Sequence, residues 1–138
     1  MLQLITDHNP SNADNTIIRD GIIGFNERKL SAENKAFSIF LKDADGKIHG
    51  GILTWLDIES VYIDILWIKE SWRGKDYGTK LILAAEAEGV KHGCRYCTVD
   101  TFDFQAEEFY LKNGYERMGE IKNYIREHSR IFLRKKIV

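Results

Sequence analysis

Residues 61–79 decide the fold of this chain, and they read VYIDILWIKESWRGKDYGT. The first eight, Val61–Ile68, are rich in β-branched and aromatic side chains, as is typical of a strand. The rest of the stretch is polar and contains two glycines. After it, small and apolar residues recur at helical spacing, at Gly78, Leu81, Ile82, Ala85 and Gly89. The stretch therefore predicts a strand, a glycine-containing loop and a helix that packs closely on a sheet.

Segments on either side of this unit also have the pattern of strands and helices. Before it, strands are expected at residues 2–5, 36–41 and 49–58, with a helix through Ile17–Phe25 and a hairpin turn at Asp43–Gly46. After it, we expect strands at residues 94–101, 115–120 and 130–137 and a short helix at 105–113 that Gly114 ends. The sequence thus predicts an α+β fold, a mixed, mostly antiparallel central sheet flanked by helices, as a single domain over residues 1–138.

Composition excludes several classes of function. The 138 residues include 20 Lys and Arg against 21 Asp and Glu, a formal charge of -1. This balance argues against a general binder of nucleic acids or anionic membranes, which normally has a basic excess. No apolar run approaches the roughly 20 residues of a membrane helix, and the N-terminus lacks the pattern of a secretory signal. We expect a protein of the cytoplasm.

The two cysteines, Cys94 and Cys97, form a Cys-x-x-Cys pair. Such a pair can be redox-active or can supply half of a zinc site, but the four histidines are scattered along the sequence. The surrounding stretch has strand character, and strand positions three apart point to opposite faces. We therefore expect two unrelated thiols that are buried or half-buried, and no metal site.

The loop Arg73–Thr79 lies where the strong strand gives way to a helix. First-turn amides of a helix lack internal partners and carry partial positive charge. Glycines let these amides approach phosphate oxygens, and Arg73, Lys75 and Lys80 add cations. The loop therefore favours phosphate binding over a tight surface turn. The spacing of a P-loop and that of a dinucleotide fingerprint are both absent.

This loop resembles the acyl-CoA diphosphate loop of the GCN5-related N-acetyltransferases (the GNAT family), Arg/Gln-x-x-Gly-x-Gly/Ala. Arg73 takes its first position and Gly78 its last, whereas Asp76 replaces the middle glycine. A second motif of the family, Phe-Tyr-x-Lys-x-Gly-Phe/Tyr, resembles residues 109–115, FYLKNGY. Both motifs have the order and the separation found in the family, so the resemblance covers nearly the whole chain.

The resemblance implies a GNAT fold, acetyl-CoA as the acyl-donor cosubstrate, and a set of binding residues. The diphosphate would bind the loop residues Arg73, Gly74, Lys75, Asp76, Tyr77, Gly78 and Thr79. Backbone groups of Leu66, Trp67 and Ile68 would hold the pantetheine arm and the thioester. Tyr110 would contact the departing sulfur and protonate it; the alternative is a tyrosine that only packs under the edge of the sheet.

Acetyl transfer also needs a group that removes a proton from the amine, because an alkyl amine with a pKa of about 10.4 is almost fully protonated at neutral pH. An acidic residue inside an apolar strand needs a partner or a function, so Asp64 is the first candidate base. Its alternative role is a structural hydrogen bond. Glu59 and Asp103 follow, and His49 and His128 are further candidates.

Asp76 is the main departure from the family pattern. Asp is one of the few residues that tolerate a positive φ, and its carboxylate could cap the following helix. A negative charge near a diphosphate is unfavourable, by about 1 kcal/mol at 4 Å in water. We expect the side chain to turn away while the backbone still binds the ligand.

The sequence thus predicts an N-acetyltransferase that transfers acetyl from acetyl-CoA to a primary amine by direct attack on the thioester. The alternatives are a non-catalytic acyl-CoA-binding module of the same fold and a binder of another phosphate ligand. We expect an amine acceptor, either a small molecule or a peptide, and no nucleic-acid or membrane partner. A homodimer is an expectation drawn from the family.

Overall fold

The computed structural model describes residues 1–138, which group into two units, Met1–Asn34 and Lys35–Val138. The single domain expected over the whole chain therefore stays a prediction, and each unit is described by itself. None of the helices combines the length and the apolar character that a membrane span requires.

The first unit contains one helix, α1 (Asn12–Leu30). The hydroxyl of Ser11 caps it by accepting a hydrogen bond from the Asp14 N–H at 3.1 Å, and Ser31 ends it with a left-handed backbone at φ 52°. The strand expected at residues 2–5 is wrong. A strand needs a neighbour for its N–H and C=O groups, and these residues pair with none.

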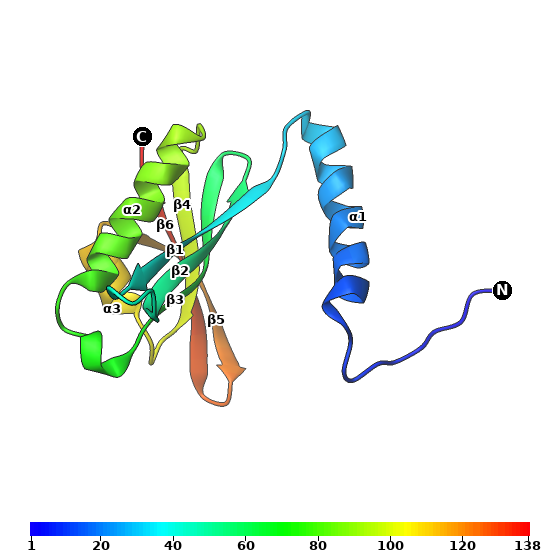
Figure 1. Ribbon diagram of the computed structural model, residues 1–138. Helices are drawn as coiled ribbons and strands as arrows, with labels where there is room; N and C mark the ends of the chain where they lie inside the picture. Colours follow the sequence, from blue (N-terminus) through cyan, green and yellow to red (C-terminus); the bar gives the residue numbers. More distant parts are fainter. The chain divides into compact units, whose positions relative to one another are not determined.

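The second unit is built on a six-stranded sheet with the order β1-β2-β3-β4-β6-β5. The strands are β1 (Lys35–Lys42), β2 (Ile48–Asp57), β3 (Ser60–Ile68), β4 (Tyr96–Phe102), β5 (Glu116–Ile125) and β6 (His128–Lys136). Every neighbouring pair is antiparallel except β3 and β4, which are parallel. This arrangement confirms the mixed, mostly antiparallel sheet of the predicted α+β fold (Figure 1).

Helix α2 (Tyr77–Lys91) follows β3 after a short 3-10 turn, η1 (Glu70–Trp72), and lies along the sheet (Figure 1). The stripe of small and apolar residues predicted for this helix is buried from Leu81 to Gly89, and its first member, Gly78, is half-buried. Its tightest point is Gly89, where an added Cβ would lie 2.3 Å from Cγ2 of Val61. The helix can approach β3 this closely because position 89 has no side chain.

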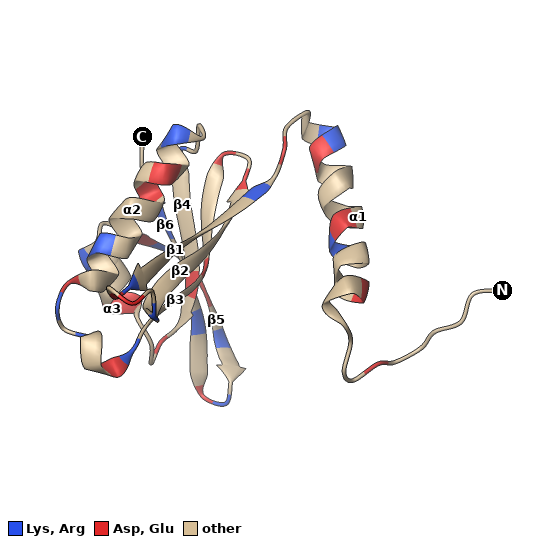
Figure 2. Ribbon diagram, viewed as in Figure 1, with Lys and Arg blue, Asp and Glu red and all other residues tan.

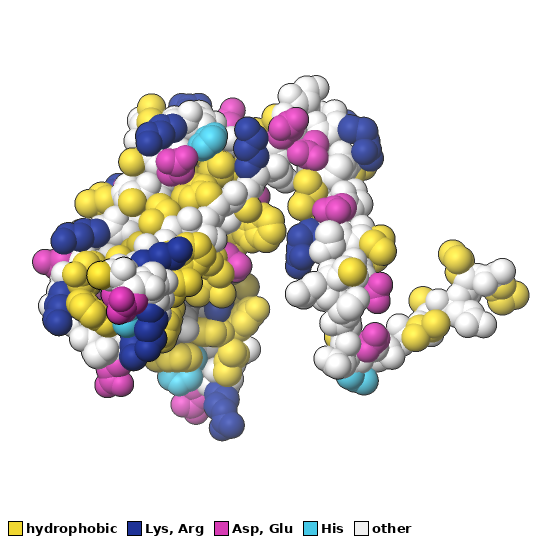
Figure 3. Space-filling view, in the orientation of Figure 1, with side chains coloured by type: hydrophobic (Ala, Val, Ile, Leu, Met, Phe, Trp, Pro, Cys, Tyr) yellow, Lys and Arg dark blue, Asp and Glu magenta, His cyan; other side chains and the backbone are white.

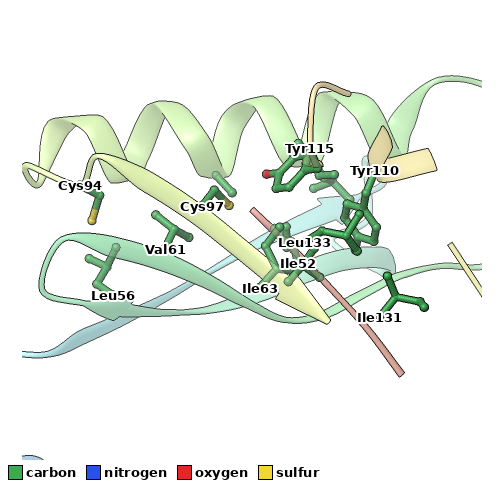
Figure 4. Packing of buried hydrophobic residues seen from close by; sticks show 14 residues of the cluster. Ile52, Leu56, Val61, Ile63, Cys94, Cys97, Tyr110, Tyr115, Ile131 and Leu133 are labelled. Carbon is green, nitrogen blue, oxygen red and sulfur yellow. The ribbon is translucent and has the colours of Figure 1, made fainter. Parts of the chain in front are cut away.

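The core of this unit lies between α2 and the sheet and includes Ile52, Ile63 and Leu133 (Figure 4). Ile82 of α2 belongs to the same core. Both cysteines are buried and free, as expected, and Figure 4 shows them in different parts of the core. Cys94 precedes β4 rather than belonging to it. Burial raises the pKa of the Cys97 thiol to about 12, so it is protonated at neutral pH.

Helix α3 (Glu107–Lys112) follows β4 and ends before Gly114, whose φ of 90° is the left-handed conformation expected there.

On the face of the molecule seen in Figure 3, basic and acidic side chains are interspersed, as the balanced composition implies.

Candidate active site

A β-bulge at Asp64 opens the sheet. In the pairing of β2 with β3, Leu53 lies opposite Ile65 and Thr54 opposite Ile63, so Asp64 is an extra residue without a partner. The parallel pairing of β3 with β4 ends at Ile63 and Val99. A bulge bends its strand and increases the local twist, so β3 diverges from β4 beyond this point.

The divergence leaves a cavity of about 230 Å³, which we call the β3–β4 cleft. It is bounded by Asp64 and Leu66 on β3, by Asp100 on β4, by Tyr110 on α3 and by Arg130 on β6. Two sequence candidates far apart in the chain, Asp64 and Tyr110, therefore line the same cavity.

A second cavity of about 370 Å³, which we call the loop cleft, lies at the N-terminus of α2. Its boundary includes most of the predicted diphosphate loop, namely Arg73, Gly74, Asp76, Tyr77, Gly78 and Thr79. Ile68 and Phe109 also line it. Because Leu66 and Ile68 belong to β3, and Tyr110 and Phe109 to α3, the two clefts adjoin the same two elements.

The backbone amides of the loop are available for a ligand. The Arg73 N–H donates to the Glu70 carbonyl at 3.1 Å, and the Lys80 N–H makes the first bond of α2, to the Asp76 carbonyl, at 3.1 Å. The six N–H groups between them, from Gly74 to Thr79, have no acceptor within the protein. Unpaired amides at a helix N-terminus bind anions because both the N–H groups and the helix dipole are favourable.

Asp76 has φ 65° and ψ 12°, so the positive φ expected at this position is present. The helix cap that its carboxylate could have formed is absent, because its side chain makes no cap hydrogen bond. An N-cap side chain normally reaches the first-turn amides from an extended backbone, and the left-handed backbone of Asp76 departs from that geometry.

Basic residues lie in and after the loop that precedes α2 (Figure 2), and their side chains are held in different ways. Arg73 turns back on β3, where its Nε donates to the Ile68 carbonyl at 2.8 Å. The Nζ atoms of Lys75 and Lys80 lie 5.0 and 5.3 Å from the ring centres of Trp72 and Tyr77. Arg73 lines the loop cleft, whereas Lys75 does not.

The three residues expected to hold the pantetheine arm are placed differently. Leu66 lines the β3–β4 cleft and Ile68 lines the loop cleft, whereas the exposed side chain of Trp67 lines neither. Arg73 occupies the Ile68 carbonyl, so that oxygen is already paired.

Tyr110 is buried, with its ring at the edge of the rings of Phe109 and Tyr115. Burial raises the pKa of the Tyr110 hydroxyl well above its usual range, and negative charge at Cys97 and Asp100 would raise it further. A tyrosine in this environment keeps its proton across the physiological range and can act as a hydrogen-bond donor.

Asp64 is exposed, and its carboxylate makes no hydrogen bond or ion pair. The structural hydrogen bond considered as its alternative role is absent. The bulge also explains the position of this carboxylate. Val61 and Ile63 are buried before it, Leu66 and Ile68 are half-buried after it, and Asp64 lies where the alternation changes phase.

The other candidate bases lie elsewhere or are already bonded. Glu59 is in the turn between β2 and β3, at the opposite end of β3 from the loop. Asp103 accepts hydrogen bonds from the Ser129 N–H and from His128, both at 2.8 Å, and these bonds lower the pKa of its carboxyl group. A carboxylate stabilised in this way is a weaker base.

His49 belongs to a separate cavity of about 110 Å³, lined also by Asp43, Trp72 and Tyr77. Its Nε2 lies 2.7 Å from Oδ2 of Asp43, and its ring centre lies 5.4 Å from that of Trp72. Neither Asp64 nor Tyr110 lines this cavity.

Sequence reasoning missed two charged groups in the β3–β4 cleft. Arg130 Nε donates to Oδ1 of Asp100 at 2.7 Å, and the Tyr62 hydroxyl donates to Oδ2 of Asp100 at 2.6 Å. Both members of the ion pair are mostly buried, with 24% of the Arg130 side chain and 13% of the Asp100 side chain exposed. The pair forms across β4 and β6, and the register of these strands could not be read from the sequence.

A buried polar network behind the cleft was also missed. Glu86 on α2 accepts hydrogen bonds from the Tyr115 hydroxyl at 2.9 Å and from Lys135 Nζ at 2.8 Å. The Tyr115 ring in turn packs against the Tyr110 ring, with ring centres 5.5 Å apart. The network therefore joins the helix that begins at the loop cleft to the tyrosine of the β3–β4 cleft.

Comparison of the sequence with a family model and with related proteins finds acetyltransferases in both cases. A family model described as the acetyltransferase (GNAT) family matches residues 6–115. The blasticidin-S acetyltransferase of Streptomyces morookaense is 35% identical over 80 residues, which are 57% of this chain and 59% of that protein. The aligned region thus spans less than two thirds of this relative.

Solved structures resemble the chain over nearly its full length. A crystal structure of an acetyltransferase from Bacillus cereus is 31% identical, covers 96% of this chain and 97% of its own, and has a TM-score of 0.78. A protein from Agrobacterium tumefaciens is 22% identical, with coverage of 98% and 99% and a TM-score of 0.86. An aminoglycoside 6'-N-acetyltransferase solved with coenzyme A shares the fold at 16% identity, with coverage of 94% and 96% and a TM-score of 0.69.

Proposed function

Because the chain belongs to the acetyltransferase (GNAT) family, a family of acyltransferase enzymes, we propose that it transfers acetyl from acetyl-CoA to a primary amine. The acceptor is a small molecule or a peptide. Action in the cytoplasm and assembly as a homodimer stay predictions.

The observation that carries the proposal is the run of six unpaired amides from Gly74 to Thr79 beside the end of β3. A diphosphate on these amides directs the rest of acetyl-CoA along β3. The arm then passes Ile68 and Leu66 and reaches the β3–β4 cleft, where β3 has separated from β4. Tyr110 lies on the opposite wall of this cleft.

In the proposed reaction, the neutral amine attacks the carbonyl carbon of the thioester. A C–N bond forms, the C–S bond breaks, and the electron pair of that bond leaves with sulfur. The products are an amide and the free thiol of CoA. Backbone N–H groups of β3 beyond Ile63, where the pairing with β4 has ended, stabilise the negative charge that develops on the carbonyl oxygen.

Two protons move in this reaction. Asp64 receives the amine proton, directly or through a water molecule, because this residue lines the cleft, is exposed, and has an unpaired carboxylate. Tyr110 donates a proton to the departing sulfur. A thiol with a pKa of about 8.5 leaves tolerably well as thiolate, so this donation contributes at most about a hundredfold.

The named relatives support this class of reaction. The Streptomyces protein is named for the acetylation of blasticidin S, and the aminoglycoside N-acetyltransferase was solved with coenzyme A. In both names the acceptor is a small molecule, which favours an acceptor of that kind here.

Ligand-induced thermal shifts test whether the protein binds acetyl-CoA. Acetyl-CoA and CoA should raise the midpoint of unfolding more than ATP or NAD do at equal concentration. A larger shift with ATP or NAD would instead favour a binder of another phosphate ligand, and no shift with any CoA species would contradict the proposal.

Release of the CoA thiol tests whether the protein transfers the acetyl group to an amine. Acetyl-CoA is incubated with polyamines, amino sugars, amino acids and lysine peptides, and CoA thiol is measured with time. Release with at least one amine, strongly reduced in Tyr110→Phe, supports the enzyme. Acetyl-CoA binding without release for any amine, together with an unchanged Tyr110→Phe, supports the non-catalytic acyl-CoA-binding module, which the acidic Asp76 in the loop also favours.

A further inference from the structure

The charges of the β3–β4 cleft are unequally paired. Both oxygens of Asp100 are hydrogen-bonded, because Arg130 donates to Oδ1 and the Tyr62 hydroxyl to Oδ2. Arg130 is held on its other side by aromatic rings, and its guanidinium carbon lies 4.4 Å from the ring centre of Phe102 and 5.8 Å from that of Tyr124. The charges of Asp100 and Arg130 therefore neutralise each other, and the two side chains hold each other in position.

Asp64 is the charge that remains. It lines the same cleft, is exposed, and makes no hydrogen bond or ion pair. The bulge places this residue outside the ladder between β2 and β3, so no neighbouring strand supplies a partner. The cleft thus presents one uncompensated negative charge to any acceptor that enters it.

We propose that the acceptor is a cationic amine without a carboxylate on the carbon that bears the amino group, and that Asp64 selects it. This inference rests on the proposed function. The ammonium ion pairs with Asp64 before the amine loses its proton. An α-carboxylate would be brought close to Asp64 and Asp100, and the positive charge of Arg130 is already paired with Asp100.

Matched pairs of acceptors test the proposal. Tyramine and tyrosine, histamine and histidine, and agmatine and arginine each differ only by the α-carboxylate. With saturating acetyl-CoA, we expect the amine to exceed its amino acid in kcat/KM for thiol release by about tenfold or more. Equal rates for the two members of a pair, or faster acetylation of the amino acid, would overturn the proposal.

Two variants assign the selection to residues. Asp64→Asn should raise KM for the amines and reduce the preference within each pair to about threefold or less, while the thermal shift with acetyl-CoA is unchanged. Asp100→Asn keeps the side-chain size but releases Arg130, so it should shift the preference toward the amino acids. An unchanged preference in Asp64→Asn would overturn the assignment, and far-UV circular dichroism verifies that each variant is folded.

The remaining outcomes separate this inference from the proposed function. A thermal shift with acetyl-CoA together with acetylation of α-amino acids alone would overturn the inference and leave the proposed function standing. The absence of any acetyl-CoA binding would overturn both.

Discussion

A Cβ atom added at Gly78 would lie 3.1 Å from Cζ of Phe109, so the first turn of α2 meets the ring that precedes Tyr110 at a residue without a side chain. Ile68 at the end of β3 also approaches this position, with its Cδ1 at 3.6 Å. The two motifs that identify the family thus touch at one point beside the loop cleft. Ligand binding at the loop and the position of α3 should therefore depend on each other.

Gly78→Ala should weaken acetyl-CoA binding. The Phe109 ring must move by a few tenths of an ångström, and overpacking of this kind costs about 1 kcal/mol or more. We expect KM for acetyl-CoA to rise about fivefold, measured by thiol release. Phe109→Leu in the same chain should restore part of the loss. Gly119→Ala is the control, because nothing lies within 4 Å of a Cβ there. An unchanged KM in Gly78→Ala would show that the contact is not tight.

Asp76→Asn should strengthen acetyl-CoA binding. Asn tolerates the positive φ of this position and removes the charge that opposes a diphosphate. A repulsion of about 1 kcal/mol corresponds to about fivefold in Kd, measured by calorimetry at low ionic strength. The gain should shrink in about 1 M salt, where the Debye length is about 3 Å. Equal binding at low salt would show that the carboxylate lies away from the ligand, and weaker binding would contradict a repulsion.

Tyr110→Phe should lower kcat by up to about a hundredfold with little change in KM for acetyl-CoA. Because burial raises the pKa of Tyr110 above its usual value, the hydroxyl stays protonated as the pH rises through that value. The ratio of wild-type to variant kcat should therefore be constant from about pH 6 to about pH 10. A ratio that falls toward 1 at the upper end would mean that Tyr110 titrates normally. Tyr96→Phe, outside both clefts, is the control.

Gly89→Ala should destabilise the fold by about 1 to 3 kcal/mol in urea unfolding. The added methyl group would lie 2.3 Å from Cγ2 of Val61 and 3.5 Å from Cβ of Cys94, both in the packed core. Val61→Ala removes the methyl group that the added side chain would meet. In a Val61→Ala background, Gly89→Ala should therefore destabilise the protein less than it does in the wild type. A stability equal to that of the wild type in Gly89→Ala would mean that α2 can move off the sheet at little cost.

Asp43→Asn should destabilise the protein at pH 7 and have less effect near pH 3. Hydrogen bonds from His49 and from the Lys47 and Asp45 amides lower the pKa of Asp43 below its usual value. The ionised carboxylate therefore stabilises the folded state above that value, and this contribution is lost as the pH falls through the lowered pKa. Urea unfolding at both pH values measures the difference. An equal loss at both would assign the effect to the shape of the hairpin turn.

The fold could be predicted from local patterns. The strand at residues 61–68, the loop and the stripe on α2 needed only periodicity and glycine positions, and the structure has all three. The strand at residues 2–5 failed because a strand depends on a neighbour that a local pattern cannot supply. The hairpin of β5 and β6 extends further than expected, to Ile125 and back from His128.

The candidate site could be predicted only in part. The positive φ of Asp76 followed from the residue type, whereas its missing cap depended on the direction of the side chain. The bulge at Asp64 and the Asp100–Arg130 pair depend on strand register, which one sequence does not determine. Glu86 lies on the buried face of α2, where the helical period predicts an apolar residue, and its partners come from β6 and the start of β5.

The extra residue at position 64 has a consequence for how such a fold could arise. In an uninterrupted ladder, β3 would stay in register with β2, and nothing would turn it from β4 after Ile63 and Val99. In a chain without this residue, we expect the two parallel strands to continue pairing beyond Ile63 and Val99, which would close the β3–β4 cleft. One inserted residue, Asp64, thus marks the point where the sheet opens, and its side chain adds a negative charge at the same place.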